Sequence, residues 1–521
     1  MRAANIARYR ISARASSALG YTTSLALPLA LPFVLLMLGC SAGGADKHGS
    51  TAQTGTGGLS LGGGTGSGGS KNTGGVMITM GGNDGVGSPA GPCEGGGWRC
   101  KVPDCTGQSP TSIRATVYDP AGVTPLYDVA AYVPNSDVAD IKTGAACETC
   151  ATPVSGDPIA SALTNAHGEF VMDEGVPAGT NVPLVLQIGK WRRVIELPEV
   201  KPCQENVFTD KDLFRLPRNQ TEGHLPKIAL TTGEADALEC FLRRIGVDDA
   251  EFTNPDGKGR INLFHDSSGG SSYQAGGSYP PVATLRGSLD TLMGYDIVLM
   301  SCVGSQSDGR LVTAQNKADL QSYLDGGGRV FLEHYHHAWL RGGNESVEIE
   351  DARKYTPTPF PAVATWVPPT DPNFDGGHAG QEAPYTVDTS FPKGADFADW
   401  LEFVGASPAG HGNISLFDVK HPAMAALPPS QQWISDATGV PYFSFNTPLA
   451  AAPEAQCGRL VHTGIHVGVE ALTGDKEGPF PSGCKSQALT AQEQALEFLL
   501  FDLSSCVMNT MDDPRPPVVV K

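Results

Sequence analysis

The hydrophobic periodicity changes once along the chain, near residue 220, and this change divides the folded part in two. Between residues 111 and 216, apolar residues recur in short alternating runs such as 113–118 and 182–188, separated by turn residues. Such runs without a helical period predict a small β-sandwich. Between 224 and 508, short apolar runs alternate with segments of helical period, which predicts a parallel sheet covered by helices. We therefore expect a multidomain chain, a β-sandwich followed by a three-layer α/β domain.

The second part places polar side chains at the ends of its strands. Its predicted strands cover 227–233, 260–264, 296–300, 329–334 and 459–466, and its predicted helices cover 234–244, 282–293, 313–324 and 490–503. Parallel strands share one carboxyl edge, where ligands bind. We therefore expect the strands that end at Gly233, Cys302, His334 and His466 to meet at one concave rim. A Pro- and Gly-rich insertion at 345–446 is expected to cover that rim. Its aromatic residues are Trp366, Phe374, Trp400 and Trp433.

Residues 1–39 have the pattern of an export signal. Four arginines precede the first acidic residue, and an apolar run at 25–38 follows, short for a membrane span. The run LMLGC that ends at Cys40 resembles a bacterial lipobox, in which the signal peptide is cut before a cysteine that is then acylated; Met37 replaces the usual Leu. The resemblance implies that Cys40 is lipidated, and Ser41 after it is typical of sorting to the outer membrane. An ordinary signal peptide and an N-terminal anchor helix are the alternatives.

The segments that flank the folded part predict a tethered protein. Residues 40–92 are rich in Gly, Ser, Thr and Asn and have little to bury, so we expect a disordered tether. The tail at 509–521 is also expected to be disordered. The formal net charge is −19, which argues against nucleic acid as a partner, because phosphates require clustered Lys and Arg. Attachment to the membrane would come from the acyl chains.

Cysteine usage agrees with export into an oxidising compartment. The chain has 12 cysteines; without Cys40 the number is odd, so one thiol is left free or pairs between chains. The disulfide candidates of the second part are Cys240, Cys302, Cys457 and Cys484. Cys147 and Cys150 form a C-x-x-C in a Gly- and Ala-rich loop, which favours a structural clip over a catalytic dithiol. A four-cysteine zinc site that includes the Cys-rich linker at 93–110 is an alternative without a clean paired spacing.

A set of positions in the first part follows a pattern of short strands and turns. They are Val117, Asp119, Gly122, Pro125, Leu126, Thr164, Gly168, Phe170, Pro177 and Gly179. This pattern resembles the carboxypeptidase regulatory-like domain, although the usual first Gly is Ala115 and the C-x-x-C loop is an insertion. The resemblance implies a carbohydrate-binding-like β-sandwich at 111–216 that is a rigid accessory in most members; sugar binding is the weaker implication. Trp191, beside two arginines, is either a sugar platform or, as we favour, an edge-strand residue that packs on the neighbouring domain.

Three runs in the second part carry a further resemblance. They are YDIVLMSC at 295–302, LQSYLDGGGRVFLEHYHH at 320–337 and GRLVHTGIH at 458–466. These runs are similar to the class I glutamine-amidotransferase-like α/β fold, and to its trehalose-utilisation (ThuA-like) branch in particular. Together with the tether, the Cys-rich linker and the sandwich, they make the whole chain similar to a family of Gram-negative secreted lipoproteins.

Cys302 is a weak candidate nucleophile. It ends a predicted strand, where glutamine amidotransferases place their catalytic cysteine. Met300 replaces the first Gly of that family's G-x-C-x-G elbow, and its H-x-E is absent because Val and Gly follow His466. A thiol without a base is not activated, so we expect Cys302 to form a disulfide, with Cys240 as the favoured partner.

The histidines at the predicted rim are the candidate ligand-binding residues. His334 and His336 are two apart at a strand end, so both can face one way. With His466 from a neighbouring strand, and Glu333 or Asp266 nearby, they form a weak candidate metal or ligand site. The alternative is that they hydrogen-bond loops at the sheet edge. A divalent metal is compatible with this set but is not expected, and the cofactor is otherwise unknown.

Three functions from different classes fit these observations. We favour a lipoprotein of the outer membrane or cell surface that is a non-enzymatic binding module, because both domains resemble carbohydrate-linked folds and no complete catalytic set is present. A ThuA-like hydrolase or isomerase acting on a glycan-related substrate is the second, and a structural envelope protein is the third. The expected partners are the membrane, through the acyl chains, and a glycan.

Overall fold

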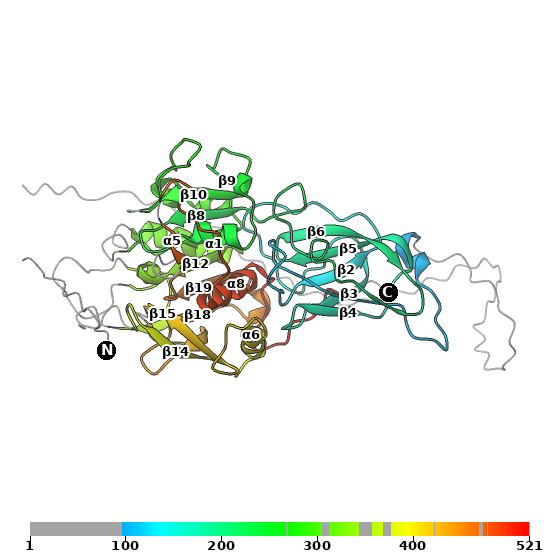
Figure 1. Cartoon of the computed structure of the whole chain (residues 1–521). Coiled ribbons are helices and arrows are strands. Elements are labelled where there is room, and N and C mark those ends of the chain that lie inside the picture. Colours follow the sequence, from blue (N-terminus) through cyan, green and yellow to red (C-terminus); the bar gives the residue numbers. More distant parts are fainter. Residues whose placement is uncertain are drawn as a thin grey trace, which may run out of the picture. The chain divides into compact units, whose positions relative to one another are not determined.

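The structure is a computed structural model of the chain, and it describes residues 96–266, 269–304, 312–342, 357–367, 377–420, 423–467, 473–476 and 478–519 (Figure 1). All of these belong to the unit Gly87–Lys521. The expected signal peptide, Cys40 and the tether at 40–92 lie outside the described residues, as does Phe374. The described part is rich in β-sheet and has few helices, and none of those helices is long and apolar enough to cross a bilayer.

Two small sheets form the first part of the described chain. The three-stranded sheet has the order β4 (Glu169–Met172), β1 (Ser112–Thr116) and β7 (Glu205–Val207), and the four-stranded sheet has the order β3 (Pro158–Leu163), β2 (Ala130–Pro134), β5 (Gly179–Ile188) and β6 (Trp191–Val200). Residues from both sheets, such as Ile113 and Leu184, are buried in one hydrophobic cluster, because successive side chains of a strand point to opposite faces. This arrangement is compatible with the predicted β-sandwich.

The sequence reasoning missed β6, the partner of β5 in a long antiparallel hairpin. Ile188 is paired with Trp191 across a two-residue turn. Gly189 in that turn has a φ of 53°, which residues with a Cβ rarely adopt. A Cβ at Gly189 would also lie 1.7 Å from the carbonyl oxygen of Ser504. Glycine is therefore required here both by the turn and by the close approach of a distant segment.

A mixed sheet of ten strands, counted over the described residues, forms the second part (Figure 1). Six parallel strands have the order β9 (Phe252–Thr253), β10 (Ile261–His265), β8 (Ile228–Thr232), β11 (Ile297–Met300), β12 (Arg329–Glu333) and β19 (Gly458–Thr463). Four antiparallel strands continue it as β18 (Tyr442–Thr447), β17 (Gln431–Ser435), β14 (Glu382–Val387) and β15 (Asn413–Phe417). The expectation that β8, β11, β12 and β19 are parallel neighbours is confirmed.

The segment 345–446, expected to be an insertion over the rim, supplies part of this sheet instead. Its described residues include β14, β15, β17, helix α6 (Pro392–Phe403) and the two-stranded sheet of β13 (Ala364–Trp366) and β16 (Ala423–Ala426). Trp400 and Trp433 are buried in the hydrophobic core and do not form an aromatic surface. Short strands between Pro- and Gly-rich loops give a weak periodic signal, and this hid them in the sequence.

Alternate residues of the parallel strands belong to two separate hydrophobic clusters. Ile228 of β8 lies in one cluster with Phe241 of α1 (Leu238–Arg244) and Leu499 of α8 (Ala491–Ser504). Its neighbour Ala229 lies in the other, with Leu320 of α5 (Ala314–Asp325). Each strand therefore buries side chains on both faces, as its nearly continuous apolar sequence predicts.

Two of the four predicted helices have the predicted boundaries to within one residue, whereas the helix expected at 234–244 begins only at Leu238. α8 begins at the predicted capping box, in which the side chains of Thr490 and Glu493 each bond the other residue's backbone. α5 begins at a similar box formed by Thr313 and Asn316. The single helix expected at 282–293 is two short ones, α2 (Ala283–Arg286) and α3 (Leu289–Met293).

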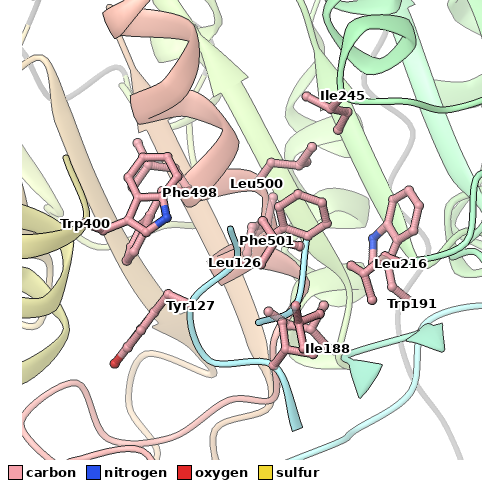
Figure 2. Packing of buried hydrophobic residues seen from close by; sticks show 14 of the residues in the cluster. Leu126, Tyr127, Ile188, Trp191, Leu216, Ile245, Trp400, Phe498, Leu500 and Phe501 are labelled. Carbon is pink, nitrogen blue, oxygen red and sulfur yellow. The ribbon is translucent and has the colours of Figure 1, made fainter. Parts of the chain in front are cut away.

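Helix α8 packs against residues of the first part (Figure 2). Trp191 of β6 is fully buried, and its ring lies edge-on to that of Phe501, with centroids 5.8 Å apart. Tyr127 stacks on Phe498 at 5.4 Å. The favoured interpretation of Trp191 is confirmed, because its ring packs on the second part and has no face left for a sugar.

Two disulfides join the same two parts, Cys147–Cys457 and Cys150–Cys506. The C-x-x-C is therefore a structural clip, as predicted, and each of its cysteines pairs with a different segment. A third disulfide, Cys105–Cys203, fastens the predicted linker to the sandwich. Because these cysteines are already bonded, the four-cysteine zinc site is not formed.

The C-terminal tail at 509–521, expected to be disordered, makes defined contacts within its described residues. Ser161 Oγ of β3 donates a hydrogen bond to the carbonyl oxygen of Pro517 at 2.6 Å. Just before the tail, Asn446 Nδ2 donates to the carbonyl oxygen of Met508 at 2.9 Å. The prolines of the tail fix φ, so holding this segment extended costs less conformational entropy than its polar composition suggests.

Candidate functional site

The carboxyl ends of four neighbouring parallel strands bring five side chains together, and we call them the rim cluster. Asp236 follows β8, Cys302 follows β11, Glu333 ends β12, His334 comes next, and His466 follows β19. None is more than 3% exposed. Cys302 Sγ lies 3.3 Å from His334 Nδ1, and the rings of His334 and His466 are 5.1 Å apart. The sheet order explains this meeting, because parallel neighbours end at the same edge.

Two carboxyl groups hold parts of the rim cluster in place. Asp236 Oδ2 is hydrogen-bonded to His466 Nδ1, and Glu333 Oε2 accepts a hydrogen bond from the backbone N–H of Cys302 at 3.0 Å. The buried carboxyl groups of Asp236 and Glu333 interact with each other, so a proton on one of them can be donated to the other. His466 Nε2 is also buried, and among the described residues it has no hydrogen-bond partner. Most buried polar atoms in proteins are satisfied, so this nitrogen requires an explanation. Asp236 was missed in the sequence because it lies beyond the strand, in the turn before α1.

His336 is not a member of the rim cluster, which corrects the predicted histidine pair. β12 ends at Glu333, and His334 has a φ of 38° and begins the 3-10 helix η3 (His334–Trp339). The alternation of a strand therefore stops before His336. Its Nε2 lies 2.9 Å from the carbonyl oxygen of Ser301, and its Nδ1 accepts from Trp339 Nε1 at 3.3 Å. For this residue the alternative, a histidine that bonds a neighbouring loop, agrees with the contacts.

Cys302 is a free thiol, so its predicted disulfide is wrong. Cys240, its favoured partner, is bonded to Cys484, and Cys457 is bonded to Cys147. Cys302 is therefore an unpaired thiol, which is one of the two outcomes that the odd number of cysteines predicts. Connectivity depends on which segments meet in the fold, so sequence spacing could not give it.

Burial decides the protonation of the rim cluster. Burial, and then the charges of Asp236 and Glu333, raise the pKa of the Cys302 thiol well above its ordinary value. Burial also raises the pKa of both carboxyl groups and lowers the pKa of His334 and His466. Each shift favours the neutral form. A neutral thiol beside a neutral imidazole lacks the thiolate that cysteine nucleophiles need.

We expect the native protein to resist alkylation at Cys302. Iodoacetamide at about pH 8 should modify this thiol on the order of a hundredfold more slowly than a free cysteine, because the thiol is buried and little thiolate is present. Intact-mass measurement after timed reaction checks this, and the same thiol should react quickly once the chain is unfolded. Fast modification of the native protein would instead support Cys302 as a nucleophile open to solvent.

A separate cavity of about 550 Å³ is lined by strands of the first part, by the C-x-x-C loop and by the tail. Its size is typical of small-molecule sites. The basic side chains of Lys142, Arg192 and Arg515 line it, and within the described chain they have no hydrogen-bond or ion-pair partner. The acidic side chains of the lining are Asp128, which is paired with Lys393, Glu148, which is paired with Lys190, and Asp140. No aromatic side chain is among its lining residues. No sequence pattern predicts this cavity, because its walls come from segments far apart in the chain.

Comparisons of the chain with protein-family models, with curated proteins and with solved structures gave no match. The function is therefore argued from the residues and their geometry.

Proposed function

We propose that this protein is an exported lipoprotein of the outer membrane or cell surface, acylated at Cys40, that binds an acidic glycan without catalysing its conversion. The single observation that carries the ligand class is the cavity in which three basic side chains have no partner among the described residues. The lipobox-like run before Cys40 and the disulfides of the described part support export.

The proposal includes a finer interpretation of the fold. We assign the first part to the carboxypeptidase regulatory-like class and the second to a three-layer α/β domain of the ThuA-like class. The order of β8, β11, β12 and β19 and the two hydrophobic clusters on their faces support the second assignment. The four antiparallel strands that continue the sheet are a departure from an all-parallel pattern.

The chemistry of the cavity favours a charged sugar over a neutral one. Neutral sugars are commonly held by stacking on aromatic rings, and no aromatic ring is among the described residues that line this cavity. Lys142, Arg192 and Arg515 can instead donate charge-assisted hydrogen bonds to carboxylate or sulfate groups. Lys190, which also lines the cavity, is already bonded to Asp296 at 2.7 Å and is not counted among the ligand donors.

The rim cluster favours a binding protein over the ThuA-like hydrolase. A hydrolase of this type needs an accessible thiolate or another activated nucleophile. Cys302 is fully buried, and burial raises the pKa of its thiol. His334 touches the thiol, but burial lowers the pKa of this imidazole, which makes it a weaker base.

A glycan array tests the ligand class. The purified mature protein should bind glycans that carry uronate or sulfate groups and should not bind their neutral counterparts. The variant Arg192→Gln/Arg515→Gln should bind about tenfold or more weakly, because about 1.4 kcal/mol of lost contact energy changes affinity tenfold. Lys201→Gln, which changes an exposed basic residue of the first part outside the cavity lining, should bind like the wild type. No binding to any acidic glycan, or equal binding by the double variant, would reject the proposal.

A further inference from the structure

The rim cluster contains nitrogen, oxygen and sulfur atoms of the kinds that bind metal ions. Two groups of three residues each bring one ligand atom per residue within 4.8 Å of the others. The first group is Cys302, His334 and His466, and the second is Asp236, Glu333 and His466. The two groups share His466. Cluster residues come from four adjacent strand ends and are buried, so the backbone around them is held by the sheet.

The spacing of these atoms suits a tetrahedral ion of the zinc type. Zinc bonds sulfur at about 2.3 Å and imidazole nitrogen at about 2.0 Å, so two of its ligand atoms lie about 3.5 Å apart. The observed distance between Cys302 Sγ and His334 Nδ1 is 3.3 Å. Zinc sites in proteins are commonly built from cysteine and histidine together. A hard cation such as Mg²⁺ would prefer an all-oxygen set.

One unsatisfied ring nitrogen gives an independent reason to expect a ligand here. His466 presents Nδ1 to Asp236, which leaves its buried Nε2 without a partner within the described residues. A carboxylate on one ring nitrogen, with the metal on the other, is the usual way in which proteins orient a metal-bound histidine.

We propose that the rim cluster binds one divalent transition-metal ion of the zinc type through Cys302, His334 and His466, with water at the fourth position and Asp236 as the residue that orients His466. The set differs from the one expected from sequence, since Cys302 takes the place of His336. On binding, the thiol gives up its proton to solvent and its sulfur becomes a thiolate ligand. The site is independent of the glycan cavity, so either proposal can fail without the other.

Cobalt substitution tests the site in the full mature protein. The protein is treated with a chelator, dialysed and titrated with Co²⁺ and then with Zn²⁺. We expect one Co²⁺ per chain, visible absorption of a tetrahedral ion and a near-ultraviolet thiolate-to-cobalt charge-transfer band, all removed by Zn²⁺. Cobalt absorption without the thiolate band, or no bound metal, would overturn the proposal.

Variants assign the ligands. Cys302→Ser should abolish the charge-transfer band, and Asp236→Asn, which keeps every ligand atom, should weaken binding about 10–100-fold. His378→Gln, at a histidine bonded to Asp436 outside the rim cluster, is the matched control and should bind like the wild type. Circular dichroism and thermal melting show whether each variant folds. If Cys302→Ser fails to fold, the charge-transfer band of the wild type and the affinity of Asp236→Asn for Co²⁺ still test the assignment. An unchanged affinity in Asp236→Asn, or an unchanged charge-transfer band in Cys302→Ser, would contradict it.

Discussion

Removing the two disulfides that join the sandwich to the second part should lower the free energy of unfolding by about 5 kcal/mol or more. The variant replaces Cys147, Cys150, Cys457 and Cys506 by serine. The bonds span 310 and 356 residues, and a cross-link that closes a loop this long removes much of the entropy of the unfolded chain. Once one bond is present the second closes a shorter loop, so their contributions do not simply double.

Urea unfolding followed by tryptophan fluorescence and far-ultraviolet circular dichroism measures this change. The matched control is Cys105→Ser/Cys203→Ser. It removes a disulfide between cysteines 98 residues apart, which joins the linker to the first part. This control should lower the free energy of unfolding by less than the four-serine variant does, and its two parts should still unfold together. The four-serine variant should unfold in two separate transitions, since only non-covalent packing then couples the parts. A loss below about 1 kcal/mol would show that the clip contributes little.

Truncating Trp400 to alanine should destabilise the protein by about 3–5 kcal/mol. This side chain of α6 is fully buried, its Nε1 donates to the carbonyl oxygen of Pro125 at 2.8 Å, and its ring is 5.4 Å from that of Phe498. The substitution leaves a cavity and removes the hydrogen bond that Trp400 donates to the partly buried carbonyl of Pro125. If Trp400 instead formed an aromatic cover over an open rim, the same truncation would cost little.

Two further substitutions separate these effects. Trp400→Phe keeps most of the apolar surface and loses the indole N–H, so we expect a loss of about 1–2 kcal/mol. Phe403→Ala changes a residue of the same helix that is 51% exposed, and it should cost under about 1 kcal/mol. Chemical unfolding of all three variants gives the comparison. An equal loss of unfolding free energy in Trp400→Ala and Phe403→Ala would contradict the buried position of Trp400.

The sequence predicted those elements whose signal is local. The apolar runs of β8, β11, β12 and β19 are buried on both faces, and this leaves a pattern that can be read without the fold. The capping box at Thr490 and Glu493 is equally local, because both side chains bond the first turn of α8. The same holds for the C-x-x-C, whose loop composition indicated a clip.

The sequence did not predict what depends on long-range packing. β14, β15 and β17 gain their stability from neighbours in the sheet, so their Pro- and Gly-rich surroundings suggested a loop. The pairing of Cys240 with Cys484 rests on two segments 244 residues apart. Likewise, the chain turns at His334, and this one change of backbone direction removes His336 from the rim cluster.

Metabolic labelling with palmitate in a Gram-negative host tests the central claim, that this protein is exported and lipid-anchored at Cys40. The full chain is expressed as the wild type and as Cys40→Ala, and the cells are then fractionated. The account predicts label on the wild-type protein in the membrane fraction and no label on Cys40→Ala. Label that persists in Cys40→Ala, or an unlabelled wild-type protein in the cytoplasm, would contradict it.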